Sequence, residues 1–478
     1  MGAERYRARM AMRPALALTL GLSLLAGVLG PGSSLAAAPA RHGARKRHHA
    51  SIPPPEVTLA PSTAAGVQVT MAPVGLSLEY PIMAQDLGTG ACPPPALVSE
   101  LQQLGSPPLA LAGDSQDATA PSGASASPPT SWETATLYTL PANFWSQLQC
   151  LLGATKEPLT VGLNARTGDL SWAQQMVAGA QSAAAGGAVD FSLGNEPDLY
   201  YLPNYAALDK PAPEEEAAAV NTYLQIATYL QPALDGAPVI GPELARPAHW
   251  QRELPRVIGA LHEQIVGVHL YPLTSCSTPK AVTLGGLLSA QAANTPHSLA
   301  WVVADAAAGQ AQAIISEANS ASCGGVAGVS DSSAAAVWAV RFVLSALKTG
   351  FREVRFHFSG GPYDPFLVRG EEVLARPLES ALVALNQWLP VGASLRTLAT
   401  GPDLVATSVT EPTGATLLIL DNERPHAQAV VLRGASSVSV QTLSASRTGL
   451  LSTSLVSPHA RIRLAVAPNS VLAVTPTG

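Results

Sequence analysis

Residues 191–200 read Phe-Ser-Leu-Gly-Asn-Glu-Pro-Asp-Leu-Tyr, and the rest of the chain can be arranged around this stretch. The apolar residues within 188–193 predict a short buried strand, which stops at a glycine. Asn195 and Glu196 follow directly. Pro197 cannot extend a hydrogen-bond ladder and favours an extended or turn conformation at Glu196. The pattern therefore places a carboxylate at the end of a strand, beside an amide that can bind a hydroxyl group.

A second stretch has the same form. Residues 313–320 read AIISEANS, an apolar strand that ends in Glu317. A lone Asn-Glu-Pro also suits a solvated turn, and a single strand-end glutamate can simply hold a neighbouring loop. Two such carboxylates together fit glycoside hydrolysis, which needs one carboxyl group as acid/base and another as nucleophile or base.

From residue 74 onward, apolar strand patterns alternate with helical ones. The predicted strands are Val74–Tyr80, Pro108–Asp114, Pro158–Asn164, Ala188–Asn195, Ala237–Glu243, Ile265–Tyr271, Ala311–Glu317 and Glu353–Ser359. The clearer predicted helices are Ser171–Ala185, Pro213–Leu234, His249–Gln264, Leu284–Ala307, Ser330–Gly350 and Leu378–Trp388. Eight strand-helix units predict a (β/α)8 TIM barrel, in which catalytic groups sit at the carboxyl ends of the strands. On this count Glu196 ends strand four and Glu317 ends strand seven.

Local signals mark some boundaries of these elements. Ser330 or Asp331 is the expected cap of the helix that Gly350 ends. Residues Glu214 to Glu216 suit the positive end of a helix dipole. The segment Asp117–Thr130 is rich in Ser, Ala and Pro, so we expect a polar loop on the active face.

After residue 390 the apolar pattern takes a period of two. The segments concerned are Ser394–Thr400, Leu404–Thr410, Thr416–Leu420, Ala427–Leu432, Ser437–Leu443 and Ala460–Val466. Short strands separated by Gly, Pro, Asn and Ser predict a β-sandwich. The early segment Val57–Met71 has no place in the barrel. We therefore predict a barrel of residues 72–390 and a sandwich of residues 56–71 plus 391–478.

Composition narrows the class of protein. The 478 residues are 47% hydrophobic and 13% charged, which suits a globular chain with a large core. The chain is long enough for two domains. A net charge of -6 argues against nucleic acid as a partner. No G-x-S-x-G or phosphate-binding glycine motif is present, so a serine hydrolase and a nucleotide-binding enzyme are disfavoured.

The amino terminus carries an export pattern. Basic residues precede an apolar run over 15–29, and small residues follow, so residues 1–38 are predicted to be a secretory signal peptide. The alternative is an uncleaved anchor, which would be the only predicted contact with a membrane. Residues 39–55 are basic and end in prolines, as in a solvated linker, and binding to an acidic surface polymer is the alternative. The expected location is extracellular or periplasmic.

Four cysteines follow the signal segment, at 92, 150, 276 and 323. An even number in an exported chain favours two disulfides, and four cysteines allow three pairings. We expect Cys92 to pair with Cys150 and Cys276 with Cys323, because each pair would join segments that are close in the barrel order. No C-x-x-C spacing is present, and we expect neither a metal nor an organic cofactor.

With these residues in place, the chain resembles glycoside hydrolase family 79, the β-glucuronidase and heparanase group. The resemblance covers residues 56–478 and rests on several short motifs in the same order. It implies that Glu196 in SLGNEPDLY is the acid/base and that Asn195 is the amide before it. It also implies that Glu317 in ISEANS is the nucleophile. In the related barrel superfamily of retaining glycosidases, these two roles belong to strands four and seven.

The resemblance extends to residues that would bind the sugar. Glu79 in GLSLEYP matches an acidic residue that holds hydroxyl groups, and Asp114 in LALAGDSQD matches a polar residue after a glycine pair. Tyr271 in VHLYP matches a tyrosine near the nucleophile. In the family, two backbone N–H groups and a further tyrosine bind the substrate's carboxylate. The matching residues here are Cys323, Gly324 and Tyr363.

The chain also departs from the family pattern. Ala110 and Ala112 stand where an arginine and the first glycine of the strand-two motif are usual, Cys323 replaces a glycine or glutamine, and Leu270 replaces an aromatic residue. These changes bear on the sugar and its linkage more than on the two glutamates.

The resulting hypothesis is an exported retaining glycosidase that cleaves a terminal β-linked uronic acid. Glu317 would attack the anomeric carbon, and the acid/base would need a pKa raised by burial and by the nearby nucleophile. The alternatives are a related glycosidase that acts on a neutral sugar and an inactive carbohydrate-binding protein. His269 and His357 lie in strands without close-spaced partners. We therefore interpret them as core histidines, or as histidines that support the site by positioning Tyr271 and the pocket floor, rather than as metal ligands.

Overall fold

Eight parallel strands close a barrel in the computed structural model, which describes residues 56–58, 66–124, 138–199, 212–276, 278–400 and 404–477. In chain order the barrel strands are β3 (Val74–Glu79), β4 (Leu109–Ala112), β7 (Leu159–Leu163), β8 (Val189–Leu193), β9 (Val239–Leu244), β10 (Ile265–Leu270), β12 (Gln312–Ala318) and β14 (Val354–Phe358). Neighbours in the chain are neighbours in the barrel, and β14 closes it against β3. All eight strand predictions are confirmed, with ends that differ by no more than two residues.

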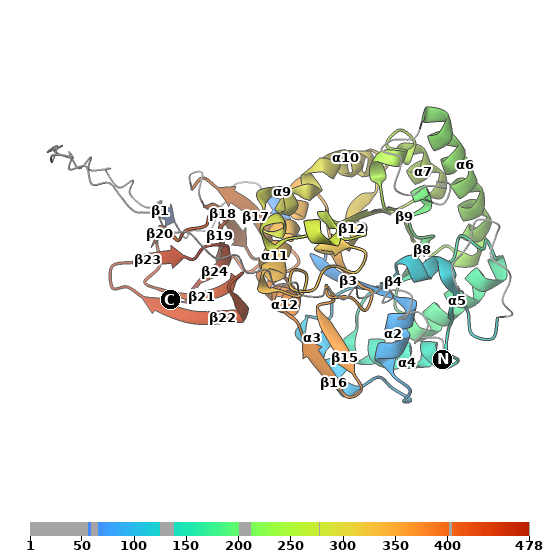
Figure 1. Cartoon of the computed structure of the whole chain (residues 1–478), viewed down its shortest axis with the longest axis horizontal. Helices are drawn as coiled ribbons and strands as arrows, with labels where there is room; N and C mark the ends of the chain where they lie inside the picture. Colours follow the sequence, from blue (N-terminus) through green and yellow to red (C-terminus); the bar gives the residue numbers. More distant parts are fainter. Residues whose placement is uncertain are drawn as a thin grey trace, which may run out of the picture. The chain divides into compact units, whose positions relative to one another are not determined.

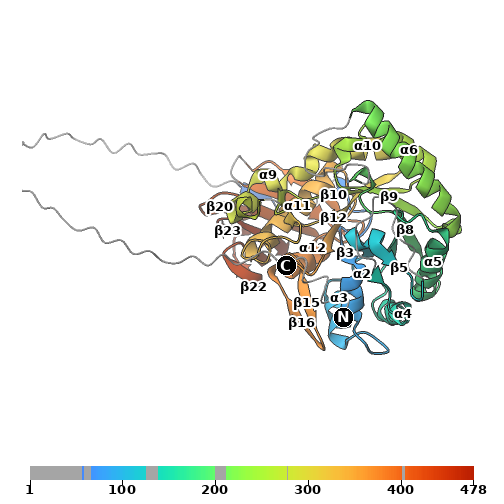
Figure 2. The same ribbon diagram turned by 45° about the vertical axis from the view of Figure 1, so that its right-hand side comes forward.

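Helices surround the barrel strands (Figures 1 and 2). The longer ones are α2 (Tyr80–Leu87), α3 (Pro95–Gln103), α4 (Phe144–Thr155), α5 (Leu170–Ala184), α6 (Pro213–Leu230), α7 (Leu254–Leu261), α10 (Ala300–Ala308), α11 (Ser333–Thr349) and α12 (Pro377–Trp388). The 3-10 turns are η1 (Asp114–Ala118), η2 (Pro197–Leu199), η3 (Gln231–Leu234), η4 (Pro247–Trp250), η5 (Pro279–Ala281) and η6 (Thr295–Leu299). Most strand positions are fully buried, as expected when side chains fill the barrel and helices cover it.

Two helix predictions need correction in their extent. The helix predicted at His249–Gln264 is shorter, because Pro247–Trp250 forms η4 and α7 covers Leu254–Leu261. The predicted helix Leu284–Ala307 is divided into α8 (Leu284–Leu287), α9 (Ala290–Ala293), η6 and α10. The hydroxyl of Ser289 accepts the N–H of Ala292 and so starts a new turn, and Pro296 follows.

The predicted cap of α11 is also wrong. The helix begins after Ser332, and its end at Gly350, with a φ of 112°, is as predicted. The hydroxyl of Ser330 accepts the N–H of Val326, and the carboxylate of Asp331 accepts the N–H of Gly328. Both side chains therefore stabilise the loop before the helix instead of the helix itself.

Antiparallel strands build the second part of the molecule. A seven-stranded sheet has the order β2-β17-β18-β19-β24-β21-β22, and a smaller sheet has the order β1-β20-β23. The strands are β1 (Glu56–Thr58), β2 (Val67–Gln68), β17 (Ser394–Leu398), β18 (Val405–Thr410), β19 (Thr416–Asn422), β20 (Gln428–Arg433), β21 (Ser437–Ser444), β22 (Arg447–Val456), β23 (Arg461–Val466) and β24 (Ser470–Pro476). In β23 buried Ile462 and Leu464 alternate with exposed arginines, which is the expected period of two.

The two amino-terminal strands pair with this second part, as predicted. β2 runs antiparallel to β17, and β1 runs parallel to β20. Strands β22 and β24 were not predicted from the sequence. The same is true of the short pairs β5–β6 (Thr119–Ala120, Tyr138–Thr139), β11–β13 (Leu273–Thr274, Ala321–Ser322) and β15–β16 (Phe366–Arg369, Glu372–Ala375). The division at residues 72 and 390 stays a prediction.

Both predicted disulfides are present. Cys92 pairs with Cys150, and Cys276 pairs with Cys323, with Cα–Cα distances of 5.5 and 5.2 Å. The predicted signal segment 1–38 and linker 39–55 lie outside the described residues. Within the described part of the chain, none of the helices has both the length and the hydropathy needed to cross a membrane.

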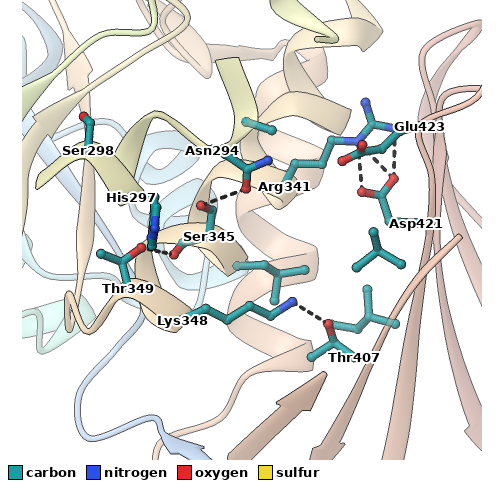
Figure 3. A pocket seen from close by; sticks show the side chains of 14 residues that line it. Asn294, His297, Ser298, Arg341, Ser345, Lys348, Thr349, Thr407, Asp421 and Glu423 are labelled. Atoms are coloured by element: carbon teal, nitrogen blue, oxygen red, sulfur yellow. Dashed lines mark hydrogen bonds and ion pairs between the residues drawn. The ribbon is translucent and has the colours of Figure 1, made fainter. Parts of the chain in front are cut away.

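Helix α11 also contacts the antiparallel sheet. The buried guanidinium of Arg341 holds both carboxylate oxygens of Asp421 on β19, at 3.0 and 3.1 Å from its Nε. The ammonium of Lys348 donates to the hydroxyl of Thr407 on β18 at 2.9 Å. A cavity of about 690 Å³ opens beside these contacts (Figure 3). None of the residues predicted to bind substrate lines it.

Candidate active site

The two predicted catalytic glutamates lie together at the carboxyl end of the barrel. Glu196 follows β8, the fourth barrel strand, and Glu317 lies in β12, the seventh. One carboxylate oxygen from each glutamate and a ring nitrogen of His269 all lie within 4.8 Å of one another. The side chain of Glu196 is 16% exposed and that of Glu317 is 9% exposed. The two carboxyl groups are therefore paired closely while one of them remains open to solvent.

The backbone around Glu196 is tightly held. Glu196 has a φ of 51°, so it adopts a left-handed turn instead of the extended alternative. Its N–H donates to the carbonyl of Glu243 at 3.0 Å, which links the ends of β8 and β9. The carboxylate of Asp117 accepts the N–H of Asn195 and the N–H of Ala165, both at 3.0 Å.

Asp198 strengthens the same link. Its two carboxylate oxygens accept the N–H groups of Ala245 and Arg246, at 3.0 and 2.7 Å. Burial first, and then the charge of Glu196, raise the pKa of Asp198 to about 7, while the two backbone hydrogen bonds oppose the rise. The loop that carries the acid/base candidate is thus anchored to its neighbours on both sides.

Glu317 accepts a hydrogen bond at one oxygen and has an ion-pair contact at the other, which accepts no hydrogen bond from the described residues. The hydroxyl of Tyr271 donates to its Oε1 at 2.7 Å. The Nδ1 of His357 lies 3.3 Å from its Oε2, and the Nε2 of the same ring lies 3.5 Å from an oxygen of Glu79. Tyr271 thus contacts the nucleophile candidate, as the sequence analysis expected. His357 joins two strand-end carboxylates and does not act as an ordinary core histidine.

Both histidines carry charge that balances the carboxylates. Burial lowers the pKa of His269, but Glu317, Glu196 and Glu243 outweigh it and hold the pKa well above its ordinary value. Burial also lowers the pKa of His357, and Glu317 and Glu79 overcome it to give about 9. The surrounding carboxylates therefore favour the charged form of both rings.

The predicted polar residues on strands one and two surround this pair. Glu79 is buried, and its carboxylate accepts the N–H groups of Asp114 and Ser115 at 3.1 and 2.7 Å. Asp114 is exposed as a residue, whereas its carboxyl group is partly desolvated by the surrounding protein. That burial, followed by the charges of Glu196, Glu79 and Glu317, raises the pKa of Asp114 to about 8. Asn195 is buried, and within the described residues its Oδ1 has no hydrogen-bond partner.

The residues predicted to hold a substrate carboxylate form a second group. The ring of Tyr363 is buried and stacks on Tyr271, with centroids 6.4 Å apart. Cys323 and Gly324 have φ values of 60° and 85°, and the disulfide to Cys276 fixes this turn. A Cβ on the next residue, Gly325, would lie 3.1 Å from the Tyr363 ring, so the turn packs against that tyrosine. The structure brings these three predicted residues together next to Tyr271.

The expected polar loop Asp117–Thr130 is only partly a loop. Residues 117–120 are buried in η1 and β5, and Asp117 supports the chain below Asn195 as described above. Residues 125–130 lie outside the described part of the chain. The prediction of a polar loop is therefore wrong for residues 117–120, which belong to η1 and β5.

Sequence reasoning missed Glu243, the penultimate residue of β9. It is buried, its Oε2 lies 3.4 Å from Nε2 of His269, and it accepts a hydrogen bond from the hydroxyl of Ser316. The signal that could have found it is the predicted strand Ala237–Glu243, which also ends in a glutamate.

The cluster of Glu196, His269 and Glu317 is better arranged for hydrogen bonding through a protonated imidazole than for binding a metal ion. Glu196, His269 and Glu317 offer atoms close enough for one ion. However, both nitrogens of His269 face carboxylate oxygens, and a doubly protonated imidazole has no lone pair to give a metal.

Solved structures share this fold. A 4-O-α-L-rhamnosyl-β-D-glucuronidase from Fusarium oxysporum 12S, in a Rha-GlcA complex, has a TM-score of 0.66 and 18% identity, covering 88% of this chain and 99% of its own. AbfB, a family 51 α-L-arabinofuranosidase from Bifidobacterium longum, has a TM-score of 0.62 and 12% identity, covering 88% and 100%. A GH51 arabinofuranosidase from Xanthomonas axonopodis pv. citri has a TM-score of 0.61 and 14% identity, with 86% of this chain and 98% of its own chain covered.

No family model matches the chain, and no curated protein matches it in sequence. The structural likenesses establish that the chain has the TIM-barrel architecture, with an added antiparallel sheet part, found in glycoside hydrolases.

Proposed function

We propose that the protein is a retaining glycoside hydrolase. The observation that carries the proposal is the carboxylate pair, since an oxygen of Glu196 and one of Glu317 lie within 4.8 Å. Retaining enzymes hold their two carboxyl groups about 5–5.5 Å apart, whereas inverting enzymes need about 6.5–9.5 Å to admit a water molecule. The fold shared with glycoside hydrolases supports the same reaction class.

The reaction follows from the positions of the two groups. A Glu317 oxygen forms a bond to the anomeric carbon while Glu196 protonates the leaving oxygen and the glycosidic bond breaks. Water then gives a proton to Glu196, attacks the anomeric carbon and releases Glu317. The Tyr271 hydroxyl, at 2.7 Å from Glu317, orients the nucleophile for the first step.

The substrate we propose is a terminal β-linked glucuronic acid, released as in family 79. The turn at Cys323 and Gly324 supports this choice, because it packs beside Tyr363 next to the nucleophile. The similarity to a rhamnosyl-glucuronidase agrees with it. We also propose that the amino-terminal segment, residues 1–38, directs export of the protein.

A neutral sugar is the second candidate. The observation that favours it is the comparable similarity to arabinofuranosidases, with TM-scores of 0.61 and 0.62. In addition, the strand-two motif has Ala110 at the position where family 79 usually has an arginine.

The test is release of p-nitrophenol from β-glucuronide, β-glucoside, β-xyloside and α-L-arabinofuranoside. We expect turnover of the glucuronide, with loss of activity in Glu317→Gln. In Glu196→Gln we expect a fall of about 10²–10⁴-fold, the usual contribution of an acid/base. The exposed Glu371, on the β15–β16 hairpin, provides the control variant Glu371→Gln, which should keep wild-type rates.

The anomer that forms first separates the mechanisms. Retention requires the β-sugar to appear before mutarotation in an NMR time course, and an α-sugar would contradict the double displacement. Turnover of a neutral glycoside alone would keep the mechanism and overturn the uronic acid. No turnover of any glycoside, including polymers, would leave the inactive carbohydrate-binding protein.

A further inference from the structure

Glu243 is a further buried glutamate at the carboxyl end of the barrel, in addition to Glu79 and the two that the proposed reaction uses. It lies near the end of β9 with a φ of 54°, in the left-handed region that costs a non-glycine residue on the order of 1 kcal/mol or more. Its side chain is 6% exposed. A Cβ at Gly267 on β10 would lie 2.7 Å from the Glu243 Oε2, so the glycine makes room for this carboxylate. The neighbouring strand is thus shaped to accept a buried charge.

The carboxylate of Glu243 faces the imidazole of His269. The Nε2 of His269 lies 3.4 Å from the Glu243 Oε2, and the Nδ1 lies 3.0 Å from an oxygen of Glu196. The same Nδ1 is 3.7 Å from an oxygen of Glu317. When Glu243 and Glu196 are both ionised, their oxygens only accept hydrogen bonds, so both ring nitrogens can be satisfied together only when both carry a proton. When Glu196 is the protonated acid, its unprotonated oxygen can still accept the Nδ1–H.

We propose that Glu243 is a positioning residue that holds His269 as an imidazolium ion, so that His269 donates its Nδ1–H to Glu196 throughout the reaction. The inference rests on the proposed glycosidase reaction and adds a group that supports its acid/base. When Glu196 gives its proton to the leaving oxygen, it becomes a carboxylate, and the His269 N–H stabilises that charge. Water later returns a proton to Glu196, and His269 keeps its own proton in both steps.

Other charged groups also face His269 or its partners. Glu317 lies on β12, Asp198 in the turn after β8, and His357 on β14. Glu79 and Asp114 act on the same carboxylates from β3 and η1. Tyr271, two residues further along β10, donates to Glu317. Among these groups Glu243 faces the Nε2 of His269, on the side away from the reacting atoms.

The direction of the effect follows from charge. The carboxylates overcome burial and hold the pKa of His269 well above its ordinary value. An opposite charge within about 4–6 Å usually shifts a pKa by about 1–3 units. Removing Glu243's charge should therefore lower the pH at which His269 loses its proton, and with it the basic limb of the kcat/KM profile.

The experiment compares wild type with Glu243→Gln in the full chain. The ¹⁵N and ¹H NMR signals of the His269 ring are followed against pH, and kcat and KM are measured over the same range. We expect both nitrogens of wild-type His269 to carry protons at pH 7. In the variant, we expect the midpoint to fall by about one pH unit or more. The basic kinetic limb should fall with it, and kcat should decrease while KM changes little.

Glu216→Gln is the matched control. Glu216 is also buried, but it accepts the N–H groups of Arg252 and Glu253, outside the barrel. This variant should leave the His269 midpoint unchanged. The proposal is overturned if one ring nitrogen of wild-type His269 is unprotonated at pH 7, a result that does not depend on the folding of any variant. It is also overturned if the titration midpoint of His269 is the same in Glu243→Gln as in wild type. The NMR titration decides this even if no glycoside is turned over, so the two proposals fail separately.

Discussion

At the scale of single residues, the site depends on how buried charges are paired. His357 shows this clearly, because its ring lies between Glu317 at 3.3 Å and Glu79 at 3.5 Å. Its pKa is raised to about 9 from 6.5, which corresponds to about 3 kcal/mol at about 1.36 kcal/mol per pKa unit. The group binds its proton more tightly in the folded state. The stabilisation is therefore complete below about pH 6.5 and is lost as the pH rises through about 9.

We predict that His357→Asn destabilises the protein most at low pH. The difference in unfolding free energy between wild type and variant should shrink between about pH 6.5 and 9.5. Urea unfolding at a series of pH values measures it. His262→Asn is the control, because His262 is exposed at the end of α7 with a φ of 53° that asparagine tolerates. A difference that stays constant over this pH range would contradict the assigned charge.

Residue patterns revealed part of the candidate site. Glu196 and Glu317 each follow an apolar run, and parallel strands in a barrel bring such ends together. Glu243 was missed as a site residue although its strand was found. Its inward direction depends on a left-handed φ and on the space left by Gly267 on another strand. Asp117 was interpreted as part of a polar loop, and only the folded chain brings it to Ala165 and Asn195.

At the scale of elements, the turn after β8 carries the acid/base candidate and is held by neighbouring turns. Asp198 in η2 accepts the N–H groups of Ala245 and Arg246 through separate oxygens. An asparagine offers only one side-chain oxygen, and its NH2 group would face a second N–H. Asp198→Asn should therefore cost about 1–3 kcal/mol of unfolding free energy, the range for a buried donor left without a partner.

The same change should lower kcat more than it raises KM, since it displaces Glu196 without removing a binding group. Asp169→Asn is the control, because Asp169 caps α5 by accepting the N–H of Trp172, and asparagine caps helices equally well. Thermal unfolding and steady-state kinetics measure both effects. Equal stability of Asp198→Asn and Asp169→Asn would rule out the anchoring role.

The barrel elements were easier to predict than the surrounding ones. Buried parallel strands give continuous apolar runs, and each of the eight was found. Strand β22 was missed because most of its residues are exposed, so no apolar alternation marks it. The segment 284–307 looks helical by composition, but Ser289 and Pro296 divide it.

At the scale of the whole molecule, α11 joins the barrel to the antiparallel sheet through a buried ion pair. Arg341 holds both oxygens of Asp421 (Figure 3). It also donates to the carbonyls of Leu288 and Asn422, at 3.2 and 3.0 Å. Burial raises the pKa of Asp421 to about 6, although Arg341 opposes the rise. A buried charge of this kind depends on its partner more than a surface charge does.

Arg341→Met should therefore destabilise the protein by about 3–5 kcal/mol, because Asp421 would be left buried without its partner. The double variant Arg341→Met with Asp421→Leu removes both charges and should recover most of that loss, since replacing a whole buried pair by apolar groups is often neutral. Urea unfolding of the three proteins gives the coupling between the two positions. A double variant as unstable as the sum of the single variants would mean that the pair contributes through packing rather than charge. The contact between α11 and the sheet would then depend on packing and on hydrogen bonds such as that of Lys348 with Thr407.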